Sequence, residues 1–156
     1  MANNSSNLSP VSLLLGFVAA AVAVITVHEA IVHILGLYKF LPATVQAWSM
    51  RPVPPYNVPQ IINSIFWGGL WGVVFAAIWP KLPGGALWLR GLIFGLLVAL
   101  VSNWMLVPLI KGVILKQPNQ PFFAGSDPMR MAAVLLIVGG FGLALGVVYG
   151  LLRNRS

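Results

Sequence analysis

The chain has 156 residues, of which 59% are hydrophobic and only 7% are charged, and its formal net charge is +7. A soluble domain carries roughly 25% charged residues, so this composition is typical of an integral membrane protein. The nine Lys and Arg residues are spread over loops and chain ends. Nucleic-acid binding needs a clustered basic face, so a nucleic-acid partner is not expected, and attraction to the headgroups of a lipid bilayer explains the charge better. The absence of cysteine excludes disulfides, thiolate metal sites and iron–sulfur clusters on this chain.

Residues 1–10 are polar and are expected to form a flexible N-terminal tail. The apolar segment that follows, residues 11–37, is too long for the core of a secretory signal and is predicted to be a retained span. Three further segments, residues 61–79, 87–110 and 129–152, also approach or exceed the ~20 residues needed to cross the hydrocarbon of a bilayer. The predicted fold is therefore an all-α integral membrane four-transmembrane-helix bundle, a single transmembrane domain over residues 1–156.

The connections between these spans differ in length. Long loops follow the first and third spans, whereas the second and third spans are joined by a tight turn around Lys81. With four spans, both termini and this turn lie on one face of the membrane and the two long loops lie on the other. The termini are predicted to be cytoplasmic, because the short turn and the tail containing Arg153 and Arg155 are the clearest positive anchors. Aromatic residues are expected to mark the two interfaces: Trp79, Trp88 and Tyr149 on one side, and Tyr38, Trp67 and Trp104 on the other.

The chain has two acidic residues, and one of them, Glu29, lies inside the first span. A carboxylate at membrane depth is costly unless it is paired or protonated, so Glu29 is a candidate functional residue. Glu29 and His33 are four residues apart and share a helix face, and this spacing suits a hydrogen-bonded pair, two metal ligands or a proton relay. The other acid, Asp127, precedes Pro128 and is explained as the N-cap of the fourth span.

The run from His28 to His33 is similar to the zinc-protease signature H-E-x-x-H but is one residue too long. Histidines five apart on a helix diverge by about 140°, so a metalloprotease site is rejected. A metal held by Glu29 and His33 would need further ligands from Asn63, Asn103 or a second chain, and no metal site is predicted. No catalytic motif is found, so neither an enzymatic activity nor a cofactor is predicted.

Folding the spans up and down brings their polar side chains into one layer near the long-loop face. These residues form the candidate intramembrane polar site: His28, Glu29, His33, Asn63, Ser64, Ser102 and Asn103. Above them, residues 50–60 contain four prolines and are predicted to be extended and polyproline-like. This segment is interpreted either as a lid, with Arg51, Pro54 and Pro55 over the carboxylate, or as a rigid connector.

Small residues recur four apart in three spans, where they would let helix backbones approach closely. The predicted packing positions are Gly68, Gly72, Gly91, Gly95, Gly142, Gly146 and Gly150. They suit packing within one chain or against a second molecule. The fourth span has the longest glycine row, so residues 129–152 are predicted to contact another copy of the chain or a partner membrane subunit.

Several segments carry a resemblance to known proteins. These are the histidine-bearing first span, Met-Arg-Pro-Val-Pro-Pro at residues 50–55, Val-Pro-Gln at residues 58–60 and Phe-Trp-Gly-Gly-Leu-Trp-Gly at residues 66–72. Together they resemble a group of small four-span bacterial inner-membrane proteins of uncharacterised function. The resemblance covers spans one and two with their loop, and it implies the fold and an inner-membrane location without an activity.

Three functions are compatible with the sequence. The leading hypothesis is an accessory or structural subunit of an oligomer or larger membrane complex. The second is a proton-coupled or ion-conducting carrier that uses Glu29 and His33 as a protonatable pair, which would require at least a dimer because one four-span chain has little room for a pathway. The third is a subunit that binds haem or chlorophyll through one axial histidine, His28 or His33.

Overall fold

The computed structural model describes residues 9–155, so residues 1–8, most of the predicted N-terminal tail, lie outside the described part of the chain, as does residue 156. Within residues 9–155 the fold is nearly all-α, and four helices are long and apolar enough to span a membrane. They are Pro10–Leu37, Gln60–Lys81, Leu87–Ile114 and Pro128–Arg153. Each matches one of the four predicted segments, and the third continues past its predicted end.

The first long helix consists of α1 (Pro10–Ala23), a π-helical segment Val24–His28, and α2 (Glu29–Leu37). It begins at Pro10, where proline is favoured because its missing N–H would have no partner in the first turn. The Ser9 side chain caps this end by accepting a hydrogen bond from the backbone N–H of Ser12 at 3.1 Å.

The proline-rich segment folds back on itself instead of running straight. Strands β1 (Pro52–Val53) and β2 (Val58–Pro59) pair antiparallel, and the peptide bond between Pro54 and Pro55 is cis. The prediction of a polyproline-like extended segment is therefore wrong for the middle of this loop. Helix α3 (Gln60–Ile78) follows β2 directly and ends in a 3-10 turn, Trp79–Lys81.

The third long helix starts as α4 (Leu87–Val98) and then widens into two π-helical segments, Ala99–Leu106 and Pro108–Ile114. Pro108 has no backbone N–H to donate, so a regular α-helical ladder cannot pass through it. Here the helix continues with wider turns and ends at Ile114, beyond the predicted boundary at residue 110.

The last helix, α5 (Pro128–Arg153), follows a short turn, Phe122–Ser126, that contains left-handed residues. Asp127 caps α5 by accepting hydrogen bonds from the backbone N–H groups of Met129 at 2.9 Å and Arg130 at 3.3 Å. The predicted capping role of Asp127 is confirmed.

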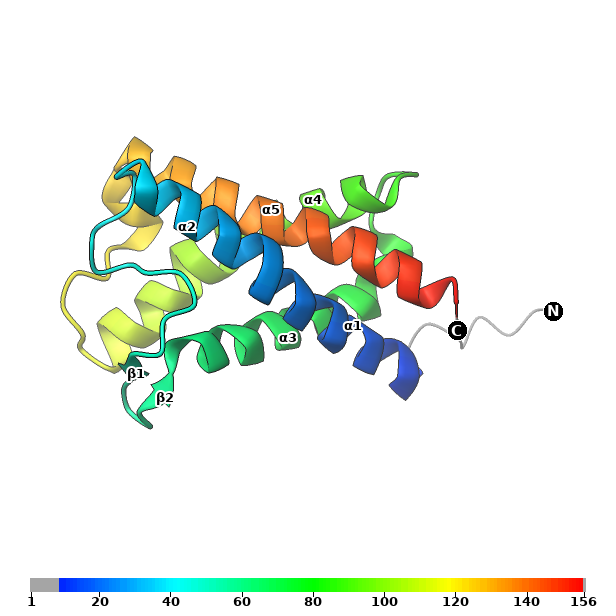
Figure 1. Ribbon diagram of the computed structural model, residues 1–156, viewed down its shortest axis with the longest axis horizontal. Helices are drawn as coiled ribbons and strands as arrows, with labels where there is room; N and C mark the ends of the chain where they lie inside the picture. The colour runs from blue at the N-terminus through cyan, green and yellow to red at the C-terminus, as the bar shows by residue number, and fades with distance from the viewer. Residues whose placement is uncertain (1–8, 156) are drawn as a thin grey trace.

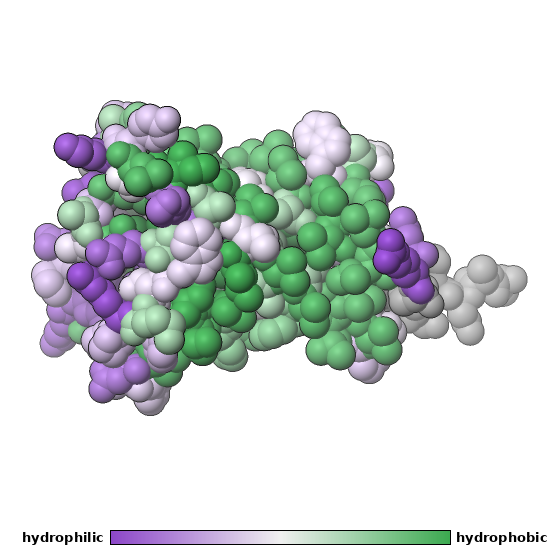
Figure 2. Space-filling model, viewed as in Figure 1, coloured by the Kyte–Doolittle hydropathy of each residue, from purple (hydrophilic) through white to green (hydrophobic). Residues whose placement is uncertain are grey.

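Figure 1 shows how the helices lie in space. The start of α1, the turn after α3 and the end of α5 lie at one end of the molecule, which we call the terminal end. Segments 38–59 and 115–127 lie at the other, the loop end. Helix α1 packs mainly on α3, and α4 packs on α5, while α1 also contacts α5. The face in Figure 2 is hydrophobic over the middle of the molecule, and hydrophilic residues gather mainly at the loop end.

Glycines form both of the main helix contacts. A side chain on Gly16 would collide with the backbone carbonyl of Gly72, and a side chain on Gly91 would collide with that of Gly142. Gly95 also lies against Gly142, whereas Gly146 and Gly150 lie against Leu87 at the start of α4. The glycine row of the fourth span thus packs within the chain, and a partner contact of residues 129–152 would have to use other side chains of α5.

The aromatic residues expected at the membrane interfaces separate into two groups. Tyr38, Trp67 and Trp88 are exposed, as interfacial anchors should be. Trp79, Trp104 and Tyr149 are instead buried inside the protein. An aromatic side chain at the end of a span has two ways to bury its ring, against lipid or against another helix, and hydropathy does not distinguish them.

Candidate functional site

Glu29 is buried, with 5% of its surface exposed, at the first turn of α2. One carboxylate oxygen, Oε1, lies 3.0 Å from Nδ1 of His28. The other, Oε2, accepts a hydrogen bond from the backbone N–H of Trp48 at 2.6 Å. This short contact attaches the loop residue to the first span.

The partner of Glu29 on its own helix is therefore His28 and not His33. The four-residue spacing made His33 the expected partner, but within residues 9–155 the His33 side chain makes no hydrogen bond. Its ring instead packs against the indole of Trp48, with centroids 5.9 Å apart. The His28 ring contacts Phe141 of α5 edge-on at 6.5 Å, so the two histidines face different neighbours.

The π-helical segment before Glu29 creates a second attachment point. In an α-helix the N–H of Glu29 would donate to the carbonyl of Ile25, four residues earlier. Here it donates to the carbonyls of Val24 and Thr26. The Ile25 carbonyl is released from that bond, and it accepts a hydrogen bond from Nε1 of Trp48 at 2.9 Å. Single π-helical turns often occur at functional sites, where they free backbone groups in this way.

Trp48 is thus bound at three points, and we call this arrangement the Trp48 clasp: Trp48 with the Glu29 carboxylate, the Ile25 carbonyl and the His33 ring. The backbone of Trp48 is left-handed, with a φ of 48°. A bulky residue in this conformation costs about 1–3 kcal/mol and persists only where its surroundings hold it. The hydrogen bonds of the clasp offset that cost.

The residue after Trp48 connects the clasp to the second span. Ser49 is buried, and its carbonyl accepts a hydrogen bond from the backbone N–H of Ile61 in α3 at 3.0 Å. Its hydroxyl accepts another from the backbone N–H of Arg51 at 3.3 Å. Segment 38–51 is therefore fixed to the first long helix at Trp48 and to α3 at Ser49.

The lid interpretation placed Arg51 over the carboxylate, but Arg51 binds elsewhere. Its guanidinium donates to the backbone carbonyl of Thr44 at 3.3 Å, within the loop, and its own carbonyl accepts from the N–H of Gln60 at 2.9 Å. Pro54 and Pro55 lie at the exposed tip of the hairpin. The segment therefore acts as a connector that continues into α3.

The remaining members of the predicted polar layer are not joined to Glu29. The half-buried side chains concerned are Asn63, Ser64, Ser102 and Asn103, and none of them makes a hydrogen bond with the part of the chain that the structure describes. Ser102 and Asn103 belong to the π-helical end of the third span, which packs mainly against α4, α5 and the segments that follow it. The layer thus reduces to the pair His28–Glu29 and its loop partner.

Trp48 is the functional candidate that sequence reasoning missed. Its decisive group is a backbone N–H, which every residue except proline carries and which no side-chain motif reveals. The sequence feature that could have indicated Trp48 is the presence of a tryptophan in a predicted loop, because a tryptophan ring and its N–H both bind partners when the residue packs on a protein surface.

A cavity of about 400 Å³ lies between α2 and loop residues 41–47, next to the clasp. His33 is its one titratable lining residue, and most of the others are apolar. Among residues 9–155, no three His, Asp or Glu side chains gather closely enough to hold a metal ion. The ionisable groups in direct contact at the site are the Glu29 carboxylate and the His28 imidazole. Comparison of the chain with protein-family models, with curated proteins and with solved structures finds no match.

Proposed function

We propose that this protein crosses a membrane four times and serves as a structural or accessory subunit of an oligomer or larger membrane complex. Four helices of sufficient length and hydropathy, and the hydrophobic middle of the surface in Figure 2, support the insertion. In this arrangement the two long loops share one face of the membrane and both termini share the other. The resemblance of the first two spans to bacterial inner-membrane proteins favours that membrane, with cytoplasmic termini.

The main support for a structural role is the pair of contacts that the Glu29 carboxylate makes. A carrier that moves protons or ions through a carboxylate must exchange the partners of that carboxylate during each cycle, as alternating access requires. Both oxygens of Glu29 are instead occupied by groups of the same chain, His28 and the backbone of Trp48. These bonds hold a strained loop in place, which is a structural role.

The partner contact is expected on the outward side of α5. Leu136, Leu143 and Leu151 are exposed, at 57%, 40% and 52% of their surfaces. Their spacing of seven and eight residues places them on one stripe of the helix, as in helices that pack side by side. The opposite face of α5, which carries Val138, Leu145 and Tyr149, is already buried inside the protein.

The experiment compares the wild type, Glu29→Gln and Asn103→Leu, a control from the same polar layer that makes no hydrogen bond in the structure. Each is purified in mild detergent and reconstituted into liposomes with a pH-sensitive dye inside. We expect a stable assembly with itself or with another membrane subunit, no proton flux above that of empty liposomes, and a weaker assembly for Glu29→Gln alone. A pH gradient-driven flux in the wild type that Glu29→Gln abolishes without loss of folding would establish the carrier instead. A lone monomer with no co-purifying polypeptide would contradict the subunit role.

A further inference from the structure

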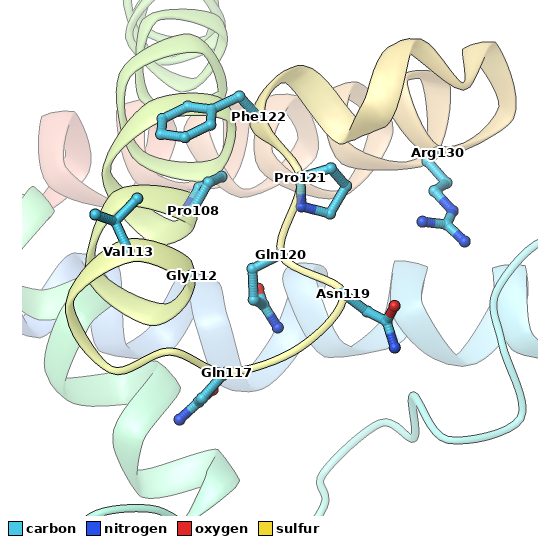
Figure 3. A pocket seen from close by; sticks show the side chains of 9 residues that line it. All are labelled: Pro108, Gly112, Val113, Gln117, Asn119, Gln120, Pro121, Phe122 and Arg130. Carbon is cyan, nitrogen blue, oxygen red and sulfur yellow. The ribbon is translucent and has the colours of Figure 1, made fainter.

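A second cavity, of about 490 Å³, lies at the loop end, away from the Trp48 clasp. Figure 3 shows its two main walls: the π-helical end of the third span, with Val113, and the loop that follows, from Gln117 to Phe122. Arg130, from the first turn of α5, lies on a third side, beyond Pro121 and Asn119. The proposed function does not use this cavity.

Hydrogen-bond donors without partners line the cavity. The side-chain amides of Gln117, Asn119 and Gln120 make no hydrogen bond within residues 9–155. Each amide carries two N–H donors, and the Arg130 guanidinium carries five. The Nε atom of Arg130 forms an ion pair with the Oδ2 atom of Asp127 at 3.4 Å, and the Arg130 side chain is 58% exposed. The terminal nitrogens of the guanidinium remain available to a ligand.

The charge around the cavity favours an anion. Lys111 and Lys116 flank the lining residues along the chain, and Arg130 is part of the wall. The one acid nearby, Asp127, has its Oδ1 atom occupied by the N–H groups that it caps. A site with several donors, an arginine and a positive surrounding potential is complementary to phosphate, because a guanidinium binds two phosphate oxygens at once.

Apolar surface adjoins these polar groups. Val113 and Phe122 line the cavity and are 58% and 46% exposed. Trp104 lies one helical turn before Pro108 of the cavity wall, and its ring packs against Phe123. Its Nε1 is the one buried side-chain donor without a partner in the described residues. A phosphate next to apolar surface at the end of a span is the arrangement of a phospholipid headgroup.

We propose that this cavity binds the phosphate group of an anionic ligand, supplied by the headgroup of an anionic phospholipid or by a free phosphate. Arg130 provides the charged contact, and the amides of Asn119 and Gln120 provide neutral hydrogen bonds to the remaining oxygens. The apolar wall accommodates the glycerol and upper acyl chain of a lipid. The lipid source rests on the proposed membrane insertion, whereas binding of free phosphate does not.

Native mass spectrometry of the detergent-solubilised protein tests the site. The protein is titrated with phosphatidylglycerol, with phosphatidylcholine and with inorganic phosphate. The matched variants are Arg130→Gln and Arg155→Gln, which each remove one arginine, at opposite ends of the molecule. We expect phosphatidylglycerol to bind more tightly than phosphatidylcholine, Arg130→Gln to lower that affinity about tenfold, and Arg155→Gln to leave it unchanged. Gln120→Leu, which keeps every charge, is expected to lower the affinity by a few fold.

The outcomes separate the sources. If millimolar inorganic phosphate competes with phosphatidylglycerol, and this competition is lost in Arg130→Gln, the cavity is a free phosphate site. If phosphatidylglycerol binds and inorganic phosphate does not compete with it, the cavity is a headgroup site. The proposal is overturned if Arg130→Gln and Arg155→Gln lower the affinity for phosphatidylglycerol equally, or if neither phosphatidylglycerol nor inorganic phosphate binds. Alkaline extraction of wild-type proteoliposomes reports on insertion separately. If the protein inserts but its affinity for phosphatidylglycerol does not depend on Arg130, only the cavity assignment is contradicted. If the protein fails to insert, the proposed function is contradicted.

Discussion

At the terminal end of the molecule the long helices are α-helical and meet through glycines and aromatic rings. Toward the loop end the first long helix contains a π-helical turn, the third becomes π-helical, and both meet the loops. The ring of Phe75 lies 4.9 Å from that of Phe94 and 5.5 Å from that of Tyr149. The Tyr149 hydroxyl is hydrogen-bonded to that of Ser12 at 2.7 Å, which joins α5 to α1. Phe75 and Tyr149 are fully buried, so this end is a close-packed interior.

The loop end shows the opposite features. It contains the buried carboxylate of Glu29, both described cavities, and residues in strained backbone conformations such as Trp48 and Asn119, with φ of 48° and 59°. Strained and π-helical segments collect at functional sites because the surrounding structure holds them there at a cost in stability. The terminal half of the bundle is therefore closely packed, and the strained backbone and the cavities lie in the loop half.

The largest effect is expected from Gly142→Ala, which inserts a methyl group where α5 touches the backbone of α4. The new Cβ would collide with the carbonyl of Gly91, and a backbone cannot move aside as a side chain can. We expect a loss of about 3 kcal/mol in the free energy of unfolding, measured by denaturant titration in detergent with far-UV circular dichroism. Gly36→Ala is the control, because a Cβ there has no neighbour within 4 Å, and it should gain up to about 1 kcal/mol. Equal stability of the two variants would refute the close contact at the terminal end.

Glu29→Ala is the corresponding test of the loop end. It leaves the N–H of Trp48 and the ring of His28 without their partner, for an expected loss of about 2 kcal/mol. Hydrogen exchange of residues 38–51 should accelerate, while exchange in α4 and α5 should stay unchanged. Asn103→Ala, which removes an amide with no hydrogen bond in the structure, should leave exchange in residues 38–51 unaffected. Uniform acceleration along the chain would show that the two ends are not separate units.

Trp48→Phe examines the contact with the π-helical turn alone. It keeps an aromatic ring against His33 and removes the hydrogen bond from Nε1 to the Ile25 carbonyl, so about 1 kcal/mol should be lost. Trp88→Phe is the matched substitution, because Trp88 is similarly exposed and makes no hydrogen bond in the structure. The comparison of the two variants by hydrogen exchange of residues 38–51 isolates the clasp, and identical exchange in both would contradict it.

The smallest effect is expected at the hydroxyl pair of the terminal end. Ser12→Ala, Tyr149→Phe and the double variant form a cycle whose coupling energy should be about 0.6 kcal/mol, the average for side-chain hydrogen bonds between membrane helices. The same unfolding titration measures it. A coupling of zero would mean that aromatic packing alone joins α1 to α5 at this end.

The number and position of the helices follow from local properties of the chain. In a bilayer, an apolar segment of about 20 residues can satisfy its own backbone as a helix. All four segments predicted on this ground are helical. The start of α5 follows equally from Asp127 and Pro128, a local cap. The third long helix extends to Ile114, past its predicted end at residue 110, because wider π-helical turns carry it through Pro108.

The partners of the site residues depend on distant parts of the chain. Helical spacing predicted that Glu29 would meet His33, but a loop backbone group from Trp48, nineteen residues later, competes for the carboxylate and binds it. In the same way, the glycine rows predict close helix contacts without naming the helices that meet. Only the packed structure pairs Gly142 with Gly91 inside one chain.

Local properties of the sequence account for the four apolar helices, the cap at Asp127 and the costly carboxylate of Glu29. The packing of the folded chain sets which group binds that carboxylate, which helices the glycines join, and where cavities remain. The difference lies in the range of the interactions. Hydropathy and capping act within a few residues, whereas a hydrogen bond from a loop or a glycine contact between helices exists only after the chain has folded.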